Sequence, residues 1–128
     1  LLRNLSRGRG VGFFEGRKFY PDFILWVVDS SGGQRIVFVE PHGMIHAGPY
    51  EYDEKARLWE RLPELAREIN NKGNNLNIVL DSYIVSATSY EDLRKKYDNG
   101  NWDRKKFNEK HILFSDDPDY IKKILLGV

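Results

Sequence analysis

Two apolar runs separated by a short polar turn constrain the fold of this chain more than any other feature. The runs span residues 23–28 and 36–39, and residues 29–34 between them read Asp-Ser-Ser-Gly-Gly-Gln. β-Branched and aromatic residues around a Ser/Gly turn are typical of a β-hairpin. Because both runs are apolar at consecutive positions, we expect both faces of the hairpin to be covered, as in central strands of a layered α/β domain.

The hairpin brings acidic residues to one of its ends, because Asp22 precedes the first run and Glu40 follows the second. A turn centred on Ser31 sets Asp22 opposite Glu40, whereas a turn centred on Gly32 sets it opposite His42. Either register places all three side chains on one face, and a register between the two separates the acids. Opposed Cβ atoms lie about 4.5–5.5 Å apart, so the two carboxylates would be close enough to share a divalent cation.

Composition fits one soluble globular domain over residues 1–128, large enough for a real core. No apolar run approaches the roughly 20 residues of a membrane span, and no basic-then-apolar leader marks secretion. The chain has no cysteine, which excludes disulfides and thiolate metal sites and favours a reducing, cytoplasmic compartment. The net charge is +1, so any contact with nucleic acid must come from local patches. The start at Leu1-Leu2, without an initiator Met, indicates a piece of a longer polypeptide.

The remaining pattern alternates strands and helices. An apolar stripe at helical spacing predicts a long helix, in which Pro63 is expected to produce a kink or divide two abutting helices. In the last helix we expect Ile121, Ile124 and Leu125 to face inward, and in the third long strand we expect 78–80 to be the buried core. This order predicts a central mixed sheet flanked by helices. The expected strands are 11–14, 23–28, 36–39, 76–86 and 112–114, and the expected helices are 51–70, 90–97 and 119–126.

The opening segment, residues 1–12, is rich in Arg and Gly and allows two interpretations. It is either a flexible junction to a preceding domain or an arm that contacts phosphate through its Arg side chains. Glu15 lies one tight turn before Asp22, so it either reaches the same end of the sheet or is a solvated turn residue.

The polar residues around the hairpin resemble a known motif. Pro21-Asp22 before the first strand and Glu40-x-His42 after the second resemble the PD-(D/E)xK nuclease superfamily. More narrowly, the sequences of residues 19–26 and 39–43 are similar to the C-terminal endonuclease domain of type III restriction and DEAD/DEAH-type helicase subunits of prokaryotes. The detailed likeness covers residues 4–43, and the rest of the chain agrees in element order.

The resemblance implies a restriction-endonuclease-like fold and a metal-dependent endonuclease that hydrolyses DNA, most naturally duplex DNA, beside a helicase or translocase. It implies that Asp22, Glu40 and the main-chain oxygen of Pro41 hold Mg²⁺, with Mn²⁺ as a substitute, and that the ion activates the attacking water. Glu15 matches the family's upstream acid only loosely, since that acid usually lies on a helix.

His42 departs from the family, which usually has Lys at this position. Beside acids and phosphate a His can stay protonated and act as Lys does, or it can accept a proton from the attacking water when neutral. We favour a working variant over a degenerate site, because both acids are present. One alternative is that Asp22 and Glu40 merely cap strand ends. A second is that the chain is a catalytically silent module that binds DNA or has a structural role in a larger polypeptide. A third is that it is an unrelated α/β ligand-binding domain.

Three other features allow both a functional and a structural interpretation. Glu40, His42 and His46 have zinc-like spacing, but Gly43 and Pro49 argue against the helix that this spacing requires. Lys55 is a candidate for the missing cation, because it lies on the first turns of the expected long helix. A basic set interleaved with Tyr97, Trp102 and Phe107 is either a solvated face or a patch that faces nucleic acid. This set comprises Arg94, Lys95, Lys96, Arg104, Lys105 and Lys106.

Overall fold

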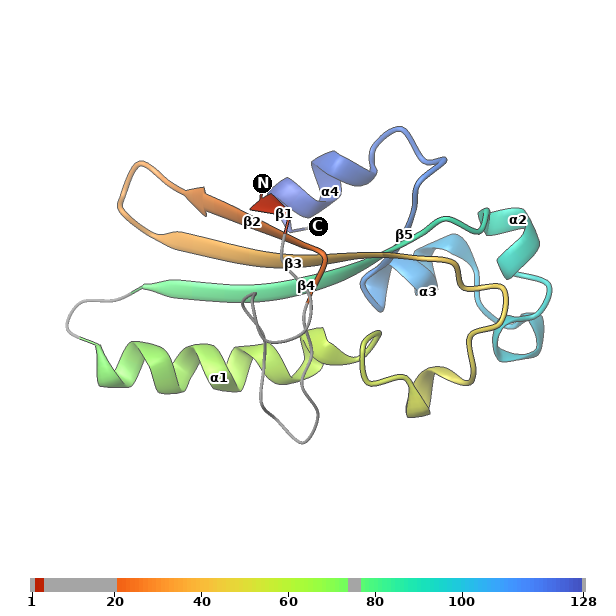
Figure 1. Cartoon of the computed structure of the whole chain (residues 1–128), viewed down its shortest axis with the longest axis horizontal. Helices are drawn as coiled ribbons and strands as arrows, with labels where there is room; N and C mark the ends of the chain where they lie inside the picture. Colours follow the sequence, from red (N-terminus) through yellow and green to blue (C-terminus); the bar gives the residue numbers. More distant parts are fainter. Residues whose placement is uncertain (1, 4–20, 74–76, 128) are drawn as a thin grey trace. The chain divides into compact units, whose positions relative to one another are not determined.

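The computed structural model describes residues 2–3, 21–73 and 77–127, and it confirms the α/β class with a mixed sheet flanked by helices (Figure 1). The strands follow the order β1-β2-β3-β4-β5 across the sheet. β1 pairs with β2, and β2 with β3, in antiparallel fashion, whereas β4 and β5 are parallel. The strands are β1 (Leu2–Arg3), β2 (Phe23–Val28), β3 (Gln34–His42), β4 (Ile78–Ser86) and β5 (Ile112–Phe114).

The chain divides into two compact units, and each is described by itself. The first unit comprises Leu1–Glu40 and Trp59–Ser82, and the second comprises Pro41–Leu58 and Tyr83–Val128. β3 and β4 each begin in the first unit and end in the second. The expected strand at 11–14 and Glu15 lie outside the described residues.

The predicted hairpin is the central feature of the first unit. β2 and β3 pair from Phe23 opposite Val39 to Val28 opposite Gln34, a register centred on Ser31. The Asp29 carboxylate closes the turn, because its Oδ1 accepts the backbone N–H groups of Ser31 at 2.9 Å and of Gly33 at 2.8 Å. The Ser31 hydroxyl also donates to Asp29 Oδ1 at 2.6 Å, and this hydrogen bond, followed by the one from the Gly33 N–H, lowers the pKa of Asp29, so its side chain stays ionised at neutral pH. An acid to which the sequence assigned no role therefore shapes the turn that sets the register.

Burial of the hairpin differs between its two strands. In β3 the consecutive residues Val37, Phe38 and Val39 are all buried, as expected of a strand covered on both faces. In β2, Trp26 and Val28 are 60% and 62% exposed, so the same expectation is wrong for one face of that strand. A continuous apolar run identifies a strand, but it does not determine how many layers cover it.

Helix α1 (Leu58–Lys72) carries the predicted apolar stripe, with Leu62 and Ala66 buried. It continues through Pro63, so the expectation of two abutting helices is wrong. The helix begins later than predicted, because the preceding residues form a short 3₁₀ helix, η1 (Tyr50–Tyr52), and turns.

The end of α1 is joined to β4 by one side chain. Asn70 Nδ2 donates to the Ile78 carbonyl at 2.9 Å, and its Oδ1 accepts the Ile78 N–H at 2.9 Å, where α1 runs alongside β4 (Figure 1). Within β4, Val79 is 51% exposed, so the expected buried core at 78–80 is wrong at its centre. Arg35 and Asp81 form an ion pair at 2.8 Å between β3 and β4.

The second unit is built around buried aromatic and aliphatic side chains. Besides η1, its described helices are α2 (Tyr90–Leu93), η2 (Tyr97–Gly100), α3 (Arg104–Glu109) and α4 (Tyr120–Leu126). The predicted helix at 90–97 is therefore shorter, and α3 forms in a segment for which we predicted no helix or strand. Its N-terminus is capped by Asp103, whose Oδ1 accepts the Lys106 N–H at 2.8 Å. The core cluster contains Met44, Tyr50, Ala56, Ile84, Leu93, Tyr97, Phe107, Ile112 and Phe114.

Helix α4 buries less of its surface than the sequence indicated. Ile124 is buried, but Ile121 and Leu125 are 56% and 44% exposed, so the prediction that all three face inward is wrong for two of them. A helix of seven residues buries one turn of its stripe here and leaves the rest in water. Throughout the described residues, no helix combines the length and the hydropathy needed to cross a membrane.

Replacing Asn70 with Ala should destabilise the first unit by about 1–3 kcal/mol, because the Ile78 backbone loses both hydrogen-bond partners. Urea unfolding followed by circular dichroism measures this loss. Asn71→Ala is the matched control, since Asn71 is exposed on the same turn of α1 and should change the free energy of unfolding by less than about 0.5 kcal/mol. Equal effects of the two variants would contradict the bridging role.

Candidate acidic site at the end of the hairpin

Asp22 and Glu40 meet at the open end of the hairpin, within the first unit. One step beyond the last paired residues, Phe23 and Val39, the register places Asp22 opposite Glu40. The backbone N–H of Asp22 donates to Glu40 Oε2 at 3.2 Å. The Ser31-centred register is thus the one present, and the chain bends at Asp22 so that its amide faces the Glu40 carboxylate.

The two acids differ in exposure. Glu40 is only 7% exposed, whereas the Asp22 side chain is exposed to solvent. A buried carboxylate needs hydrogen-bond donors to offset its lost hydration, and the Asp22 amide is one such donor. Glu40 therefore fixes the backbone at the entrance to β2, and Asp22 presents its carboxylate outward from that fixed backbone.

The other predicted site residues are Pro41, His42 and Glu15. Pro41 and His42 are the last residues of β3 and are exposed, and both belong to the second unit. The His42 carbonyl accepts the Ala87 N–H at 3.0 Å, so the end of β3 is anchored there. Glu15 lies outside the described residues. The structure thus brings together Asp22 and Glu40 from the predicted set.

The donor chemistry of this site suits a hard cation more than zinc. Among the described residues, no group of three or more His, Asp or Glu side chains is arranged to hold a metal ion, so the Glu40, His42 and His46 combination gains no support. Mg²⁺ binds through one or two carboxylates together with waters and substrate phosphate, and two opposed acids satisfy that smaller requirement. Asp22 and Glu40 therefore fit Mg²⁺ by number and type of ligand.

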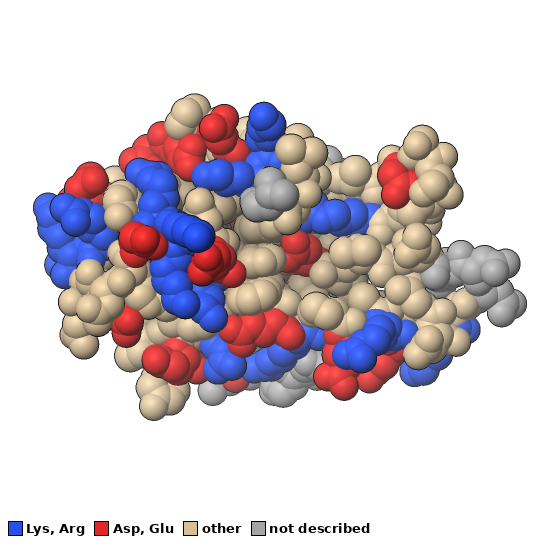
Figure 2. Space-filling view, turned by 180° about the vertical axis from the view of Figure 1, so that it is seen from behind, with Lys and Arg blue, Asp and Glu red and all other residues tan. Residues whose placement is uncertain are grey.

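The predicted basic patch lies in the second unit and is partly neutralised. Arg94 Nε pairs with Glu91 at 2.9 Å, and Lys105 Nζ lies 4.0 Å from Glu109. On the face shown in Figure 2, Lys and Arg side chains alternate with Asp and Glu rather than forming a field of one sign. Exposed pairs of this kind contribute little to stability, and they weaken the attraction of the surface for a polyanion.

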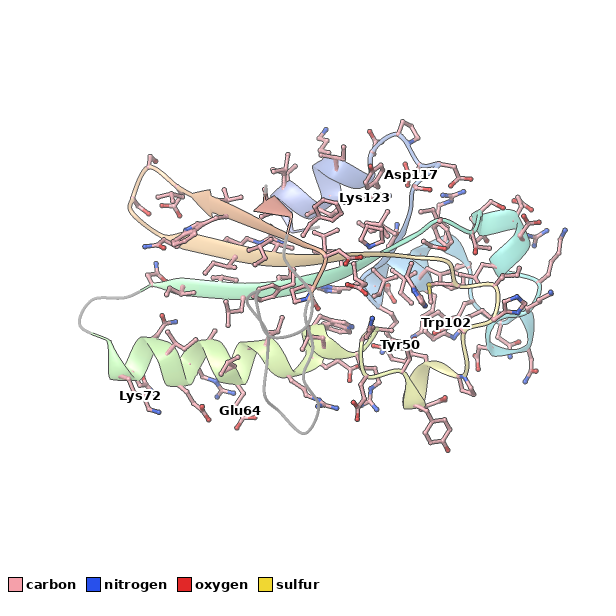
Figure 3. All side chains as sticks on the ribbon, in the orientation of Figure 1. Tyr50, Glu64, Lys72, Trp102, Asp117 and Lys123 are labelled. Atoms are coloured by element: carbon pink, nitrogen blue, oxygen red, sulfur yellow. The ribbon has the colours of Figure 1, made fainter. Side chains whose placement is uncertain are left out.

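The aromatic residues of this segment pack within the second unit. Tyr97 and Phe107 are 4% and 0% exposed. Trp102 is half-buried, and its ring centroid lies 5.3 Å from that of Tyr50 and 4.9 Å from that of Tyr97 (Figure 3). Burial, followed by the charge of Asp53, raises the pKa of the Tyr97 hydroxyl. Tyr97 and Phe107 are therefore core residues and do not present their rings at the surface.

Lys55 does not lie on the long helix. It is an exposed residue of the turns between η1 and α1, in the second unit. The premise that placed it beside the acids, a helix beginning at Glu51, is therefore wrong.

Asp117 joins several charged and polar groups of the second unit. Its Oδ2 accepts from Lys123 Nζ at 2.7 Å and lies 3.8 Å from Arg104, and its Oδ1 accepts the Asp119 N–H at 3.0 Å (Figure 3). Arg104 in turn covers the Tyr90 ring at 4.5 Å. The hydrogen bond from Lys123 lowers the pKa of Asp117. A shallow hollow lies here between Arg104 and Asp117, but its opposite charges compensate each other and leave no anion site.

Comparisons of the chain with protein-family models, with curated proteins and with solved structures found no match.

The lowered pKa of Asp117 predicts an acid-sensitive second unit. Its ionised form is favoured in the folded state, so this stabilisation is present above the unfolded-state value near 3.8 and is lost as pH falls through the lower folded-state pKa. Thermal unfolding from pH 6 to pH 2 should therefore show a smaller drop in Tm for Asp117→Asn than for the unchanged protein. Asp116→Asn is the control, since the exposed Asp116 should leave the pH dependence unaltered.

Proposed function

We propose that this chain is a metal-dependent phosphodiesterase domain that hydrolyses DNA, with Asp22 and Glu40 as its acidic pair. The observation that supports the proposal is the hairpin register, which sets the two acids opposite each other at the end of two paired strands. Paired carboxylates on a hairpin, with Pro before the first acid and His two residues after the second, resemble the PD-(D/E)xK arrangement. The restriction-endonuclease-like form of the mixed sheet is part of this proposal.

Mg²⁺ would be held by Asp22 and Glu40, with the Pro41 carbonyl as the third protein ligand that the resemblance suggests. A bound Mg²⁺ or Mn²⁺ supplies positive charge beside the scissile phosphate and makes a nearby water more acidic. Asp22 supplies the exposed carboxylate, and Glu40 keeps that carboxylate in place by accepting the Asp22 N–H at 3.2 Å. A carboxylate on a fixed backbone loses less conformational entropy when it binds an ion. The hydrogen bond between the Asp22 N–H and Glu40 therefore favours metal binding.

His42 takes the position at which the resemblance suggests Lys. Protonated, it adds a positive charge for the phosphate, and neutral, it accepts a proton from water. Its exposure at the end of β3 leaves it accessible to substrate. The wider proposal is a DNA-cleaving module, acting on duplex DNA and operating beside a helicase or translocase.

A second candidate is a catalytically silent module that binds DNA or braces a larger assembly. It is favoured by the burial of Glu40 and by its hydrogen bond to the Asp22 backbone, which is also how a purely structural clamp would look. The neutralised charge pairs around α2 and α3 favour the bracing role over DNA binding. The two candidates differ in their response to divalent ions. The enzyme should nick DNA when Mg²⁺ or Mn²⁺ is present, and the silent module should not.

Asp22→Ala should reduce plasmid nicking in Mg²⁺ or Mn²⁺ by about 100-fold or more, because it removes the exposed metal carboxylate. Stability should change by less than about 0.5 kcal/mol, since the side chain is exposed and its backbone N–H remains. Glu64→Ala, on the exposed side of α1, is the matched control and should nick as the unchanged protein does. Equal nicking by the two variants, or none by the unchanged protein with either ion, would remove the enzyme and favour the silent module.

His42→Lys should keep or raise nicking activity, because Lys supplies a permanent positive charge for the phosphate. His46→Lys is the control, since His46 is another exposed His four residues further along the chain. Its nicking activity should match that of the unchanged protein. Complete loss of activity in His42→Lys alone would mean that His42 acts as a base and not as a replacement for Lys.

A further inference from the structure

The outer edge of β2 is paired along only part of its length. β1 pairs with Ile24 and Phe23 through Leu2 and Arg3. Among the described residues, no strand pairs with the rest of this edge, from Leu25 to Val28.

The hydrogen-bond pattern of the hairpin determines which backbone groups point to that edge. In an antiparallel pair, successive residues direct their N–H and C=O groups alternately toward and away from the partner strand. The Asp29 N–H donates to the Gly33 carbonyl at 2.9 Å, so the backbone groups of Asp29 point toward β3. Leu25 and Val27 lie four and two residues before Asp29, so their N–H and C=O groups also point toward β3. Trp26 and Val28 therefore direct their N–H and C=O groups outward, along the line that β1 follows at Ile24.

The sequence of β2 lacks two of the features that usually prevent strand addition. Natural edge strands are protected by charged residues, Pro, bulges or covering loops. From Phe23 to Val28 there is no charged residue and no Pro. Trp26 and Val28 are 60% and 62% exposed, and they lie on the same face because they are two residues apart in a strand. Outward backbone groups and apolar side chains are thus available together.

We propose that this edge binds an extended apolar peptide segment of another protein, added antiparallel to β2 as a further strand. Strand addition of this kind obtains affinity from main-chain hydrogen bonds and specificity from alternate side chains. The β1–β2 pairing sets the direction, since the incoming strand continues the line of β1 with its C-terminal end toward Leu2. The inference does not rest on the nuclease proposal.

Two features specify the chemistry of the segment. Apolar side chains suit the positions opposite Trp26 and Val28, and a basic residue suits the position opposite Asp29, which is exposed and stays ionised. A second copy of this chain suits the edge less well. Two β2 edges laid together would place no basic residue of β2 opposite Asp29, because β2 contains none.

The probe is a short peptide, acetyl-Lys-Val-Thr-Val-amide, titrated into the whole chain and followed by the amide NMR signals of Trp26 and Val28. In the proposed register the two valines exchange hydrogen bonds with Trp26 and Val28, and the threonine N–H points to solvent. Methylating both valine nitrogens should weaken binding about tenfold or more, because two hydrogen bonds are lost. Methylating the threonine nitrogen should leave the affinity within about twofold, because that group faces water.

Matched variants test the edge from the side of the protein. Trp26→Lys and Val28→Lys should abolish saturable binding, whereas Val79→Lys should retain it, because Val79 is an apolar strand residue of the first unit that is also more than half exposed but does not lie on β2. Each variant is checked for unchanged thermal unfolding. The proposal is overturned if the peptide does not bind saturably, if both methylated peptides bind alike, or if Val79→Lys loses binding as well. Self-association that Val28→Lys abolishes, without peptide binding, would instead assign the edge to a second copy.

Discussion

The register of one hairpin is the constraint on which the described structure of the first unit depends. Asp29 closes the turn by accepting two backbone N–H groups, and the pairing of β2 with β3 follows from a turn centred on Ser31. Side chains alternate across a strand, so a slip of one residue would reverse the face of every side chain in β2 relative to β3. The same register sets Asp22 opposite Glu40 and directs the backbone of Trp26 and Val28 outward. The proposed site and the proposed binding edge are thus two results of one turn.

The second unit is organised by packing instead of by strand register. Phe107 and Phe114 lie at its centre, with ring centroids 5.2 Å apart and nearly perpendicular planes, and Tyr90 packs edge-on against both. Asp117 then ties α4 to this core through Lys123 and approaches Arg104 of α3. Charged residues near the core therefore hold elements together here. Three residues of the basic set, Arg94, Arg104 and Lys105, likewise lie beside acidic side chains, so the set is partly neutralised.

The sequence predicted the features that depend on local pattern. Alternation and turn chemistry identified the hairpin, helical spacing identified the buried stripe of α1 through Leu62 and Ala66, and the apolar triplet 112–114 was correctly placed as β5. Exposure was less predictable, because it depends on which distant elements cover a residue. Trp26, Val79 and Ile121 are apolar and exposed, although their patterns resembled those of core residues. The hydrogen bond from Asp22 to Glu40 joins residues 18 apart, and the register made their proximity predictable but not which group would donate.

That hydrogen bond bears on how the acidic pair would act. Two ionised carboxylates held close together repel each other, and the repulsion is greater where one is shielded from water. Here Glu40 faces the Asp22 amide, so a backbone dipole and not a second carboxylate is its partner on that side. One buried and one exposed acid thus lie at the same end of the hairpin, and the Asp22 N–H offsets part of the charge of the Glu40 carboxylate.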